Sequence, residues 1–282
     1  MTDATGLAGF EERRADLRGA SLRYFVGGAG PPLLLVHGLA GAASNWVELA
    51  PLLARRYRLL IPELPGHGGS EALPATPSLD PFADRVVELA RLEGMLPAAI
   101  AGHSLGGTVA LRAAARHPDE VTAVVLLAGA GISSAGRSIE NTVTFAVLGR
   151  PGRAVSPLRG LIAHRPWARA LVLGGWQVAD PGSLSAVATE GFLAGPGLHV
   201  DAEQAGYALQ AGDPRLGLDR VRCRCLCVWG ADDRLVPLAD GVEYARRLGA
   251  PLRAVADCGH LLIGERPAAC ADAIESFYPS GR

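Results

Sequence analysis

The stretch "AIAGHSLGGTVAL", residues 99–111, places one serine between two glycines at the point where an apolar run ends. The apolar residues before the serine predict a buried strand, and the Ala-rich residues after it predict a helix that ends before Pro118. A turn that joins a strand directly to a helix must be sharp, and Gly102 and Gly106 leave the chain room for it. We therefore expect Ser104 to have a strained backbone and an outward-pointing hydroxyl, which makes it a candidate nucleophile.

Near-continuous apolar segments alternate with amphipathic segments along most of the chain. Residues 13–28 predict a hairpin of two strands. The apolar segments predict further strands at residues 31–38, 57–66, 122–131, 223–230 and 251–259. The amphipathic segments predict helices at residues 45–56 and 80–94. Apolar strands separated by helices are typical of a mostly parallel sheet covered by helices on both faces, so the sequence predicts an α/β fold.

The alternation stops at about residue 133 and resumes after residue 214. The sequence between them is rich in Gly and Pro, is helical or loop-like, and contains no convincing strand. It therefore reads as a helical unit inserted between two strands of one sheet, with residues 1–132 and 215–282 forming the two parts of the core. Its large apolar residues, which suit a small or medium apolar acyl group, include Phe145, Trp167, Trp176 and Phe192.

Composition excludes several classes of function. The net charge of the 282-residue chain is -1, so nothing favours a nucleic acid or an anionic membrane as a partner. All 27 basic residues are arginine, which excludes Schiff-base chemistry and a phosphate-loop lysine. The N-terminus has no apolar core, and the longest apolar run is too short to span a bilayer, so we expect a soluble, cytoplasmic protein.

Three of the five cysteines alternate in the predicted strand at 223–230. Alternation places Cys223, Cys225 and Cys227 on one face of the strand, where we expect them to pack as small buried hydrophobes. A metal site needs ligands that converge from separate segments, so the sequence predicts neither a metal nor another cofactor.

A serine nucleophile needs a base, and the base needs a group that orients it. Among the seven histidines, His260 follows the last predicted strand, where sheet-end loops converge. The loop after the preceding strand offers Asp232 and Asp233, and spacing alone does not decide which of them faces the histidine. His37 and His103, together with Gly38, lie close to the serine or in a glycine-rich loop, and we expect them, with Trp167 and Trp176, to contact the substrate.

The developing negative charge of an acyl-transfer reaction needs two backbone N–H donors, an oxyanion hole. Leu105 begins the helix after Ser104, where N–H groups lack partners inside the helix. Leu39 follows the His-Gly pair of the loop after the strand at 31–38, and Gly38 and Gly41 keep that loop open. These two residues are the candidate donors.

Taken in order, the motifs of the chain resemble those of the α/β-hydrolase superfamily over its full length. They are "VHGLAG" (36–41), "PELPGHGGS" (62–70), "GHSLGG" (102–107), "WGADDRLVP" (229–237) and "CGHLLIGERP" (258–267). The resemblance implies that Asp233, four residues before Pro237, is the acid and that residues 133–214 are a cap over the site. The family often has aspartate where this chain has Glu63, and we expect no catalytic consequence because that loop mainly supports the turn.

The resemblance implies a serine hydrolase whose partner is a small-molecule acyl substrate, with a carboxylic ester, or a thioester, as the first expectation. An acyltransferase, a perhydrolase and a carbon–carbon hydrolase or lyase use the same three residue types and stay open. Epoxide hydrolases and haloalkane dehalogenases carry aspartate in place of Ser104, which argues against both. The meta-cleavage carbon–carbon hydrolases tend to carry Asn before the serine and Trp after the final histidine. This chain has His103 and Leu261 at these positions, which argues against that branch. A non-catalytic ligand-binding protein is disfavoured because each predicted catalytic position holds a residue that can perform its role in the reaction.

Overall fold

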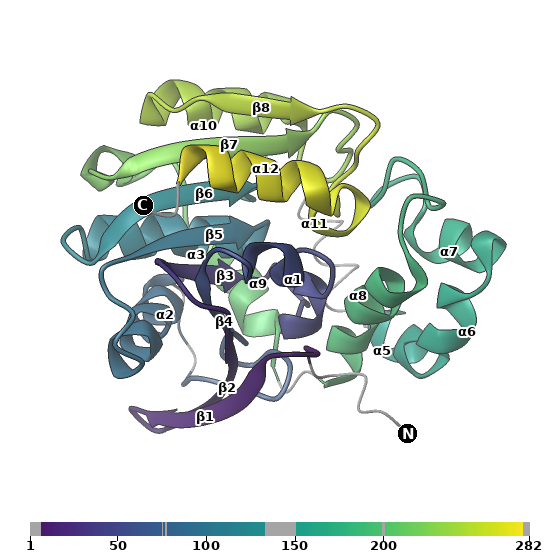
Figure 1. The fold of residues 1–282 in the computed structure, drawn as a ribbon, viewed down its shortest axis with the longest axis horizontal. Helices are drawn as coiled ribbons and strands as arrows, with labels where there is room; N and C mark the ends of the chain where they lie inside the picture. The colour runs from purple at the N-terminus through teal and green to yellow at the C-terminus, as the bar shows by residue number, and fades with distance from the viewer. Residues whose placement is uncertain (1–6, 75, 77, 133–150, 199–200, 279–282) are drawn as a thin grey trace.

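The computed structural model describes residues 7–74, 76, 78–132, 151–198 and 201–278. Its centre is an eight-stranded sheet in the order β1-β2-β4-β3-β5-β6-β7-β8 (Figure 1). The strands are β1 (Glu11–Leu17), β2 (Ala20–Gly27), β3 (Pro32–Val36), β4 (Arg58–Pro62), β5 (Ala98–His103), β6 (Val121–Leu127), β7 (Arg224–Gly230) and β8 (Leu252–Val255). The β1–β2 and β2–β4 pairs are antiparallel and the other five pairs are parallel, so the expected mostly parallel sheet is confirmed.

Helices cover both faces of this sheet (Figure 1). One face carries α2 (Asp80–Leu92), α3 (Leu105–Arg116) and α10 (Leu238–Leu248). The other face carries α1 (Ala50–Leu53), α11 (Leu262–Glu265) and α12 (Pro267–Phe277), with α12 packed on α1 and β7. The expected two-sided α/β arrangement is therefore confirmed.

The helix expected at residues 45–56 is wrong in extent. The chain forms two short pieces instead, the 3₁₀ helix η1 (Ala43–Trp46) and α1. Pro51 lies in the first turn of α1, where its missing N–H costs nothing, whereas the same proline in the interior of a longer helix would break a backbone hydrogen bond.

The central strands are buried completely. The side chains of residues 33–36 in β3 are 0% exposed, and Trp229 at the end of β7 and Tyr244 in α10 are equally enclosed. The edge strands differ, since β1 alternates between exposed and half-buried positions and β8 is only four residues long. A strand that is apolar on both faces thus lies in the middle of the sheet, as parallel sheets require.

The expectation for the three alternating cysteines holds only in part. Cys225 and Cys227 are buried in β7, and burial raises the pKa of the Cys227 thiol to about 12. Cys223 precedes the strand, which begins at Arg224, and it packs against the same core but is only half-buried. Among the described residues no cluster of His, Cys, Asp and Glu could hold a metal ion.

A helical segment lies between β6 and β7 in the chain and beyond the carboxyl ends of the parallel strands (Figure 1). Its elements are α5 (Pro151–Val155), η3 (Ser156–Leu158), α6 (Arg159–Ala163), α7 (Pro166–Leu173) and α8 (Ala186–Leu198). We call residues 151–198 the cap. It has a hydrophobic cluster of its own, which contains Ile162, Ala168, Leu173, Val178, Leu184, Ala188, Leu193 and, from the core, Leu261.

The last part of the predicted insertion packs differently from the cap. In α9 (Glu203–Ala211), Ala205, Ala208 and Leu209 belong to the main hydrophobic core, and η4 (Leu218–Arg220) follows before β7. Residues 133–150 of the predicted insertion, Phe145 among them, lie outside the described residues. None of the helices in the described ranges is long and apolar enough to cross a membrane.

Candidate active site

Ser104 occupies the sharp turn between β5 and α3. Its backbone has φ 52° and ψ -119°, a conformation that non-glycine residues rarely adopt. Three backbone hydrogen bonds hold it there: the Ser104 N–H donates to the Leu127 carbonyl (3.0 Å), and the Ser104 carbonyl accepts from Gly107 (2.9 Å) and Ala130 (2.9 Å). The strained turn that the sequence predicts is therefore present, and neighbouring segments stabilise it.

The two flanking glycines are required by close backbone contacts. A Cβ atom on Gly102 would lie 2.2 Å from the Gly106 carbonyl oxygen. A Cβ atom on Gly106 would lie 2.1 Å from the Val36 oxygen and 2.6 Å from the His37 oxygen. The first turn of α3 thus rests directly on the end of β3, which brings the loop after β3 to the serine.

His260 and Asp233 form a buried pair. His260 Nδ1 lies 2.9 Å from Asp233 Oδ2, and the two side chains are 3% and 0% exposed. Asp233 Oδ1 accepts the backbone N–H groups of Leu235 (2.9 Å) and Val236 (2.8 Å), which fixes the carboxylate. Asp232 is exposed, so of the two aspartates that spacing leaves open, Asp233 is the one that contacts the histidine.

The Asp233 carboxylate favours the tautomer of His260 that has its proton on Nδ1. That tautomer leaves Nε2 unprotonated, as a base requires. In the described part of the chain no hydrogen bond joins the Ser104 hydroxyl to His260. Bonds of this kind are often long without substrate and tighten in the complex.

His103, which we expect to contact the substrate, lies against the ring of His260. The two rings are 4.9 Å apart between centroids, and His103 Nε2–H donates to the His260 backbone carbonyl (2.9 Å). Burial, reinforced by His260, lowers the pKa of His103 to about 3, so this ring is neutral. His103 therefore supports the backbone of His260.

His37, the second histidine that we expect to contact the substrate, has backbone partners at both ring nitrogens. It is fully buried, its Nδ1–H donates to the Gly38 carbonyl (2.8 Å), and its Nε2 accepts from the Leu64 N–H (3.0 Å). With both ring nitrogens engaged, and with its pKa lowered by burial, His37 holds the loop in place. Gly38 does border the nucleophile, because a Cβ atom there would lie 3.1 Å from the Ser104 Cβ.

The two candidate oxyanion donors directly follow Ser104 and Gly38 in the chain. Leu105 is the first residue of α3, so its N–H has no acceptor inside the helix. Leu39 follows Gly38 in a turn closed by a hydrogen bond from the Gly41 N–H to the Gly38 carbonyl (3.0 Å). Ala40 in this turn has φ 56°, and α8 packs on it so closely that a Cβ atom on Gly195 would lie 2.9 Å from the Ala40 oxygen.

Glu63 anchors the loops behind this site. Its carboxylate forms a two-point ion pair with Arg23, with distances of 2.7 Å and 2.9 Å, and is 0% exposed. The same carboxylate accepts the backbone N–H groups of Ala43 (3.2 Å) and Gly69 (2.6 Å). The glutamate that departs from the usual family residue therefore ties η1 and the loop after β4 to β2.

The two tryptophans expected to line the pocket face solvent. Trp167 is 64% exposed, because α7 turns Ala168 and Leu173 inward instead, and Trp176, which follows α7, is 39% exposed. Their predicted role as a pocket wall is not supported. The half-buried Phe192 of α8 contacts the histidine loop instead, since a Cβ atom on Gly264 would lie 2.5 Å from its ring.

Sequence reasoning missed two residues that contact the His260 loop, Gln177 and Glu265. The Gln177 carbonyl accepts the His260 N–H at 2.8 Å, and a backbone acceptor of this kind leaves no signal in the sequence. Glu265 is buried and is the single acid in the apolar run "HLLIGERP", which was a usable signal.

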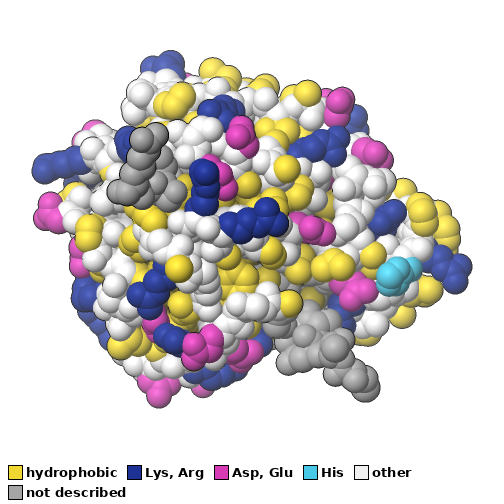
Figure 2. Space-filling view, in the orientation of Figure 1, with side chains coloured by type: hydrophobic (Ala, Val, Ile, Leu, Met, Phe, Trp, Pro, Cys, Tyr) yellow, Lys and Arg dark blue, Asp and Glu magenta, His cyan; other side chains and the backbone are white. Residues whose placement is uncertain are grey.

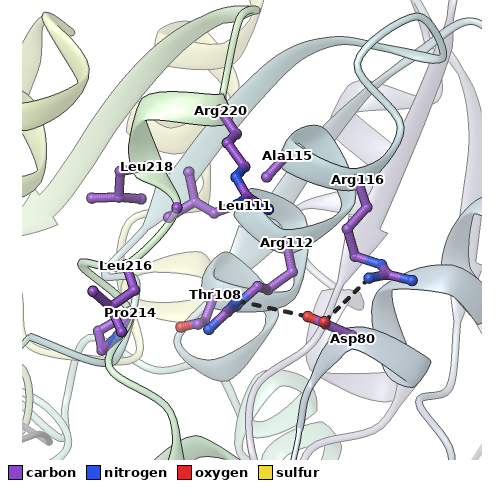
Figure 3. Close-up of a pocket in the computed structure, with 11 residues that line it drawn as sticks. Asp80, Thr108, Leu111, Arg112, Ala115, Arg116, Pro214, Leu216, Leu218 and Arg220 are labelled. Atoms are coloured by element: carbon purple, nitrogen blue, oxygen red, sulfur yellow. Dashed lines mark hydrogen bonds and ion pairs between the residues drawn. The ribbon is translucent and has the colours of Figure 1, made fainter.

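A small pocket lies elsewhere, between α3, the start of α2 and the segment before β7 (Figure 3). Its volume is about 70 Å³, and none of the candidate site residues lines it. Arg112 and Arg116 reach into it but are ion-paired with Asp80, at 3.7 Å and 3.2 Å. Its size is below the range of about 300–1,000 Å³ typical of ligand sites, so it is not the substrate site.

A serine on a strained strand-to-helix turn, with a buried Asp–His pair at the carboxyl edge of a parallel sheet, defines the α/β class of hydrolases. Comparison with known sequences gives the same assignment. The chain belongs to the alpha/beta hydrolase family, whose sequence model matches residues 33–273.

Several relatives match most of the chain. It is 34% identical to a pimeloyl-[acyl-carrier protein] methyl ester esterase of Aromatoleum aromaticum, over 87% of this chain and 97% of that protein. It is also 34% identical to the magnesium-chelatase 30 kDa subunit of Rhodobacter capsulatus, over 83% of this chain and 81% of that protein. Some relatives are longer, and the chain spans only 34% of the length of one of them.

The fold also matches solved structures. A crystal structure of an alpha/beta hydrolase fold protein from Burkholderia ambifaria superposes with a TM-score of 0.72 and 27% identity. That match covers 96% of this chain and 98% of the other. The similarity therefore extends over the cap as well as the core.

Proposed function

We propose that the protein hydrolyses carboxylic esters of small to medium apolar acids, and thioesters of the same acids, through an acyl-enzyme on Ser104. The observation that carries the proposal is the buried His260–Asp233 pair, 2.9 Å apart, beside a serine held at φ 52°. A serine hydroxyl is a poor nucleophile at neutral pH and needs a base to take its proton. The His260–Asp233 pair supplies such a base in a fixed tautomer.

In the proposed first half-reaction, Ser104 Oγ attacks the acyl carbon while its proton passes to His260 Nε2. The backbone N–H groups of Leu39 and Leu105 stabilise the oxyanion, and each such donor is worth about 3–4 kcal/mol in comparable sites. The protonated His260, stabilised by Asp233, then gives its proton to the leaving alcohol or thiol. The C–O or C–S bond breaks and the acyl group stays on the serine.

In the second half-reaction, His260 removes a proton from a water molecule, and the resulting nucleophile attacks the acyl-enzyme. The same donors stabilise the second oxyanion, and His260 returns the proton to Ser104 Oγ as the acid product leaves. No step needs a cofactor. The name of the Aromatoleum relative, a methyl ester esterase, supports an ester as substrate, and the chain covers nearly all of that relative.

Hydrolysis of a panel of p-nitrophenyl esters of increasing acyl length, run beside matched thioesters, tests the proposal. We expect turnover that is highest for a short or medium acyl chain and is lost in Ser104→Ala, whose fold should be unchanged. Asp232→Asn is the matched control, since this exposed neighbour of Asp233 has no part in the proposed reaction. Absence of turnover on the whole panel, or near-wild-type turnover in Ser104→Ala, would contradict the proposal.

A further inference from the structure

The loop that carries His260 is attached to the cap through one buried carboxylate. Glu265, in α11, is only 4% exposed. Its Oε1 accepts the backbone N–H of Gly259, the residue before His260, at 3.0 Å. Its Oε2 accepts the backbone N–H of Ala179, in the cap, at 3.0 Å. One side chain therefore links two segments that are far apart in the chain.

The cap stretch that Glu265 contacts lies directly on the histidine loop. We call residues 174–180 the cap clasp. The Gln177 carbonyl accepts the N–H groups of His260 (2.8 Å) and Leu261 (3.1 Å). The two backbones are so close that a Cβ atom on Gly259 would lie 2.7 Å from the Ala179 nitrogen. The position of the His260 peptide therefore depends on where the clasp lies.

The clasp also contacts the loop of the acid. Arg234, the residue after Asp233, donates from Nη1 to the Gly175 carbonyl at 3.1 Å. The clasp is itself closed by a bridge between Gly174 and Val178. The loops of both members of the Asp233–His260 pair thus rest on the same short stretch of the cap.

We propose that Glu265 is a positioning residue, which holds the His260 loop against the cap clasp and thereby sets the orientation of the imidazole toward Ser104. This inference rests on the proposed function, because it assigns to Glu265 the task of orienting the base of that reaction. Glu265 itself does not touch the reacting atoms.

A carboxylate suits this task and a neutral side chain of equal size does not. Both oxygens of Glu265 face N–H donors, whereas a glutamine would turn an NH₂ group toward one of those donors. Burial raises the pKa of the Glu265 carboxyl, and backbone N–H groups of Gly259, Ala179 and Asp180 oppose that rise. Glu265→Gln keeps the volume and removes one of the two links, so it should release the clasp without creating a cavity.

Two variants and one control test this assignment. Glu265→Gln removes a link chemically, and Gly259→Ala separates the same segments sterically, so the second variant remains informative if the first folds poorly. Ser44→Ala is the matched control. It removes a hydrogen bond of another cap–core contact, from Ser44 Oγ to the Gly191 carbonyl of α8 (2.8 Å), and leaves the Asn45 bond to the same carbonyl (3.1 Å).

The measurements are ester turnover and the rate of phosphonylation by a fluorophosphonate, with the labelled fraction determined at completion. We expect both Glu265→Gln and Gly259→Ala to lower kcat and the phosphonylation rate constant roughly 10- to 100-fold, with KM changed less than about twofold, because a displaced base slows chemistry more than binding. Every folded chain should still be labelled at completion. Ser44→Ala should stay within about twofold of wild type.

A merely structural carboxylate would give another pattern: fewer chains labelled at completion, with an unchanged rate constant per labelled chain. That pattern would overturn the positioning role, and so would equal rate constants in wild type and both variants. Failure of the wild type to take up any label would instead contradict the proposed function.

Discussion

The sheet and the cap bury their apolar side chains to very different extents. In β3 residues 33–36 are 0% exposed, whereas in the cap Trp167 is 64% exposed and Leu171 is 77% exposed. Figure 2 shows apolar side chains exposed at the end of the molecule where the cap lies, among charged residues of both signs, and further apolar side chains over the rest of this face. The sheet can therefore fix side chains rigidly, and the cap cannot do so to the same degree.

The candidate catalytic groups follow this division. Ser104, Asp233 and His260 come from turns at the ends of buried strands, and the cap contacts the His260 loop through a backbone group, the Gln177 carbonyl. A backbone contact holds a loop in place whatever the side chain, so chemistry can stay fixed while cap side chains vary. The comparison predicts that substitutions in the core change kcat or the free energy of unfolding strongly and that substitutions on the cap surface change them little.

The largest effect is expected at Asp233. Asp233→Asn should lower kcat about 10⁴-fold, because an amide favours the wrong tautomer of the histidine, as in serine proteases. Asp232→Asn, at the exposed neighbour, should stay within about twofold of wild type. Steady-state kinetics on one good ester compares the two, and the opposite order of effects would contradict the pairing of Asp233 with His260.

The next largest effect concerns the ion pair that anchors the loops behind the site. Arg23→Met leaves the fully buried Glu63 carboxylate without its cation, and we expect the free energy of unfolding to fall by about 3–5 kcal/mol. Arg91→Met breaks a surface pair with Glu120, in which Arg91 is 50% exposed, and should cost less than about 1 kcal/mol.

Urea unfolding of both arginine variants measures this difference. Arg23→Met combined with Glu63→Gln should recover part of the loss, because the unpaired charge is then gone. Equal destabilisation by Arg23→Met and Arg91→Met would show that burial of the Arg23–Glu63 pair does not matter, and the anchoring role of Glu63 would then have to be abandoned.

A pH effect of intermediate size is expected from His103. Its pKa of about 3 in the folded protein is below the ordinary value of 6.5. Between these two pH values the histidine therefore binds a proton in the unfolded chain but not in the folded chain. The contribution of His103 to the free energy of unfolding is then fully present above pH 6.5 and is lost as the pH is lowered from 6.5 toward 3. At pH 4.5 the loss from this one group is about 3 kcal/mol.

Urea unfolding at pH 7 and pH 4.5 measures this loss. His103→Gln removes the titrating group but can still donate a hydrogen bond to the His260 carbonyl, so its stability should fall less between the two pH values. An identical fall in wild type and variant would contradict the assignment of a neutral buried ring, with the buried His37 contributing equally to both.

The smallest effect is expected on the cap surface. Trp167→Ala removes a side chain that is 64% exposed, so stability should change by less than about 0.5 kcal/mol and the preferred acyl length should stay the same. Phe192→Ala removes a ring that packs on Gly264 beside the histidine loop, and it should alter the activity on different acyl lengths unequally. A shift in acyl preference for Trp167→Ala alone would mean that substrate reaches the outer face of α7.

The same division explains which predictions from sequence were reliable. Around Ser104 the apolar run, the two glycines and the helix pattern act over a few residues, so strand, turn and helix were all predictable. The choice between Asp232 and Asp233 needed the family resemblance, because both lie in the loop after β7, where spacing does not tell which side chain turns toward the histidine.

The contacts of the cap were not predictable in this way. Trp167 looked like a pocket residue because apolar spacing says which residues share a helix face and not which neighbour that face meets. The Gln177 carbonyl and the Glu265 bridge depend on two segments that meet only in three dimensions. The contacts of His37 with the Leu64 N–H and of His103 with the His260 carbonyl were not predictable for the same reason, since these partners belong to other loops.

The most direct test of the central claim is the site of covalent modification by a fluorophosphonate. We predict one adduct per folded chain, mapped by mass spectrometry to the peptide that contains Ser104, and no adduct in Ser104→Ala with an unchanged thermal melt. An adduct on another residue, or equal labelling of wild type and Ser104→Ala, would contradict the assignment of Ser104 as the nucleophile activated by the His260–Asp233 pair.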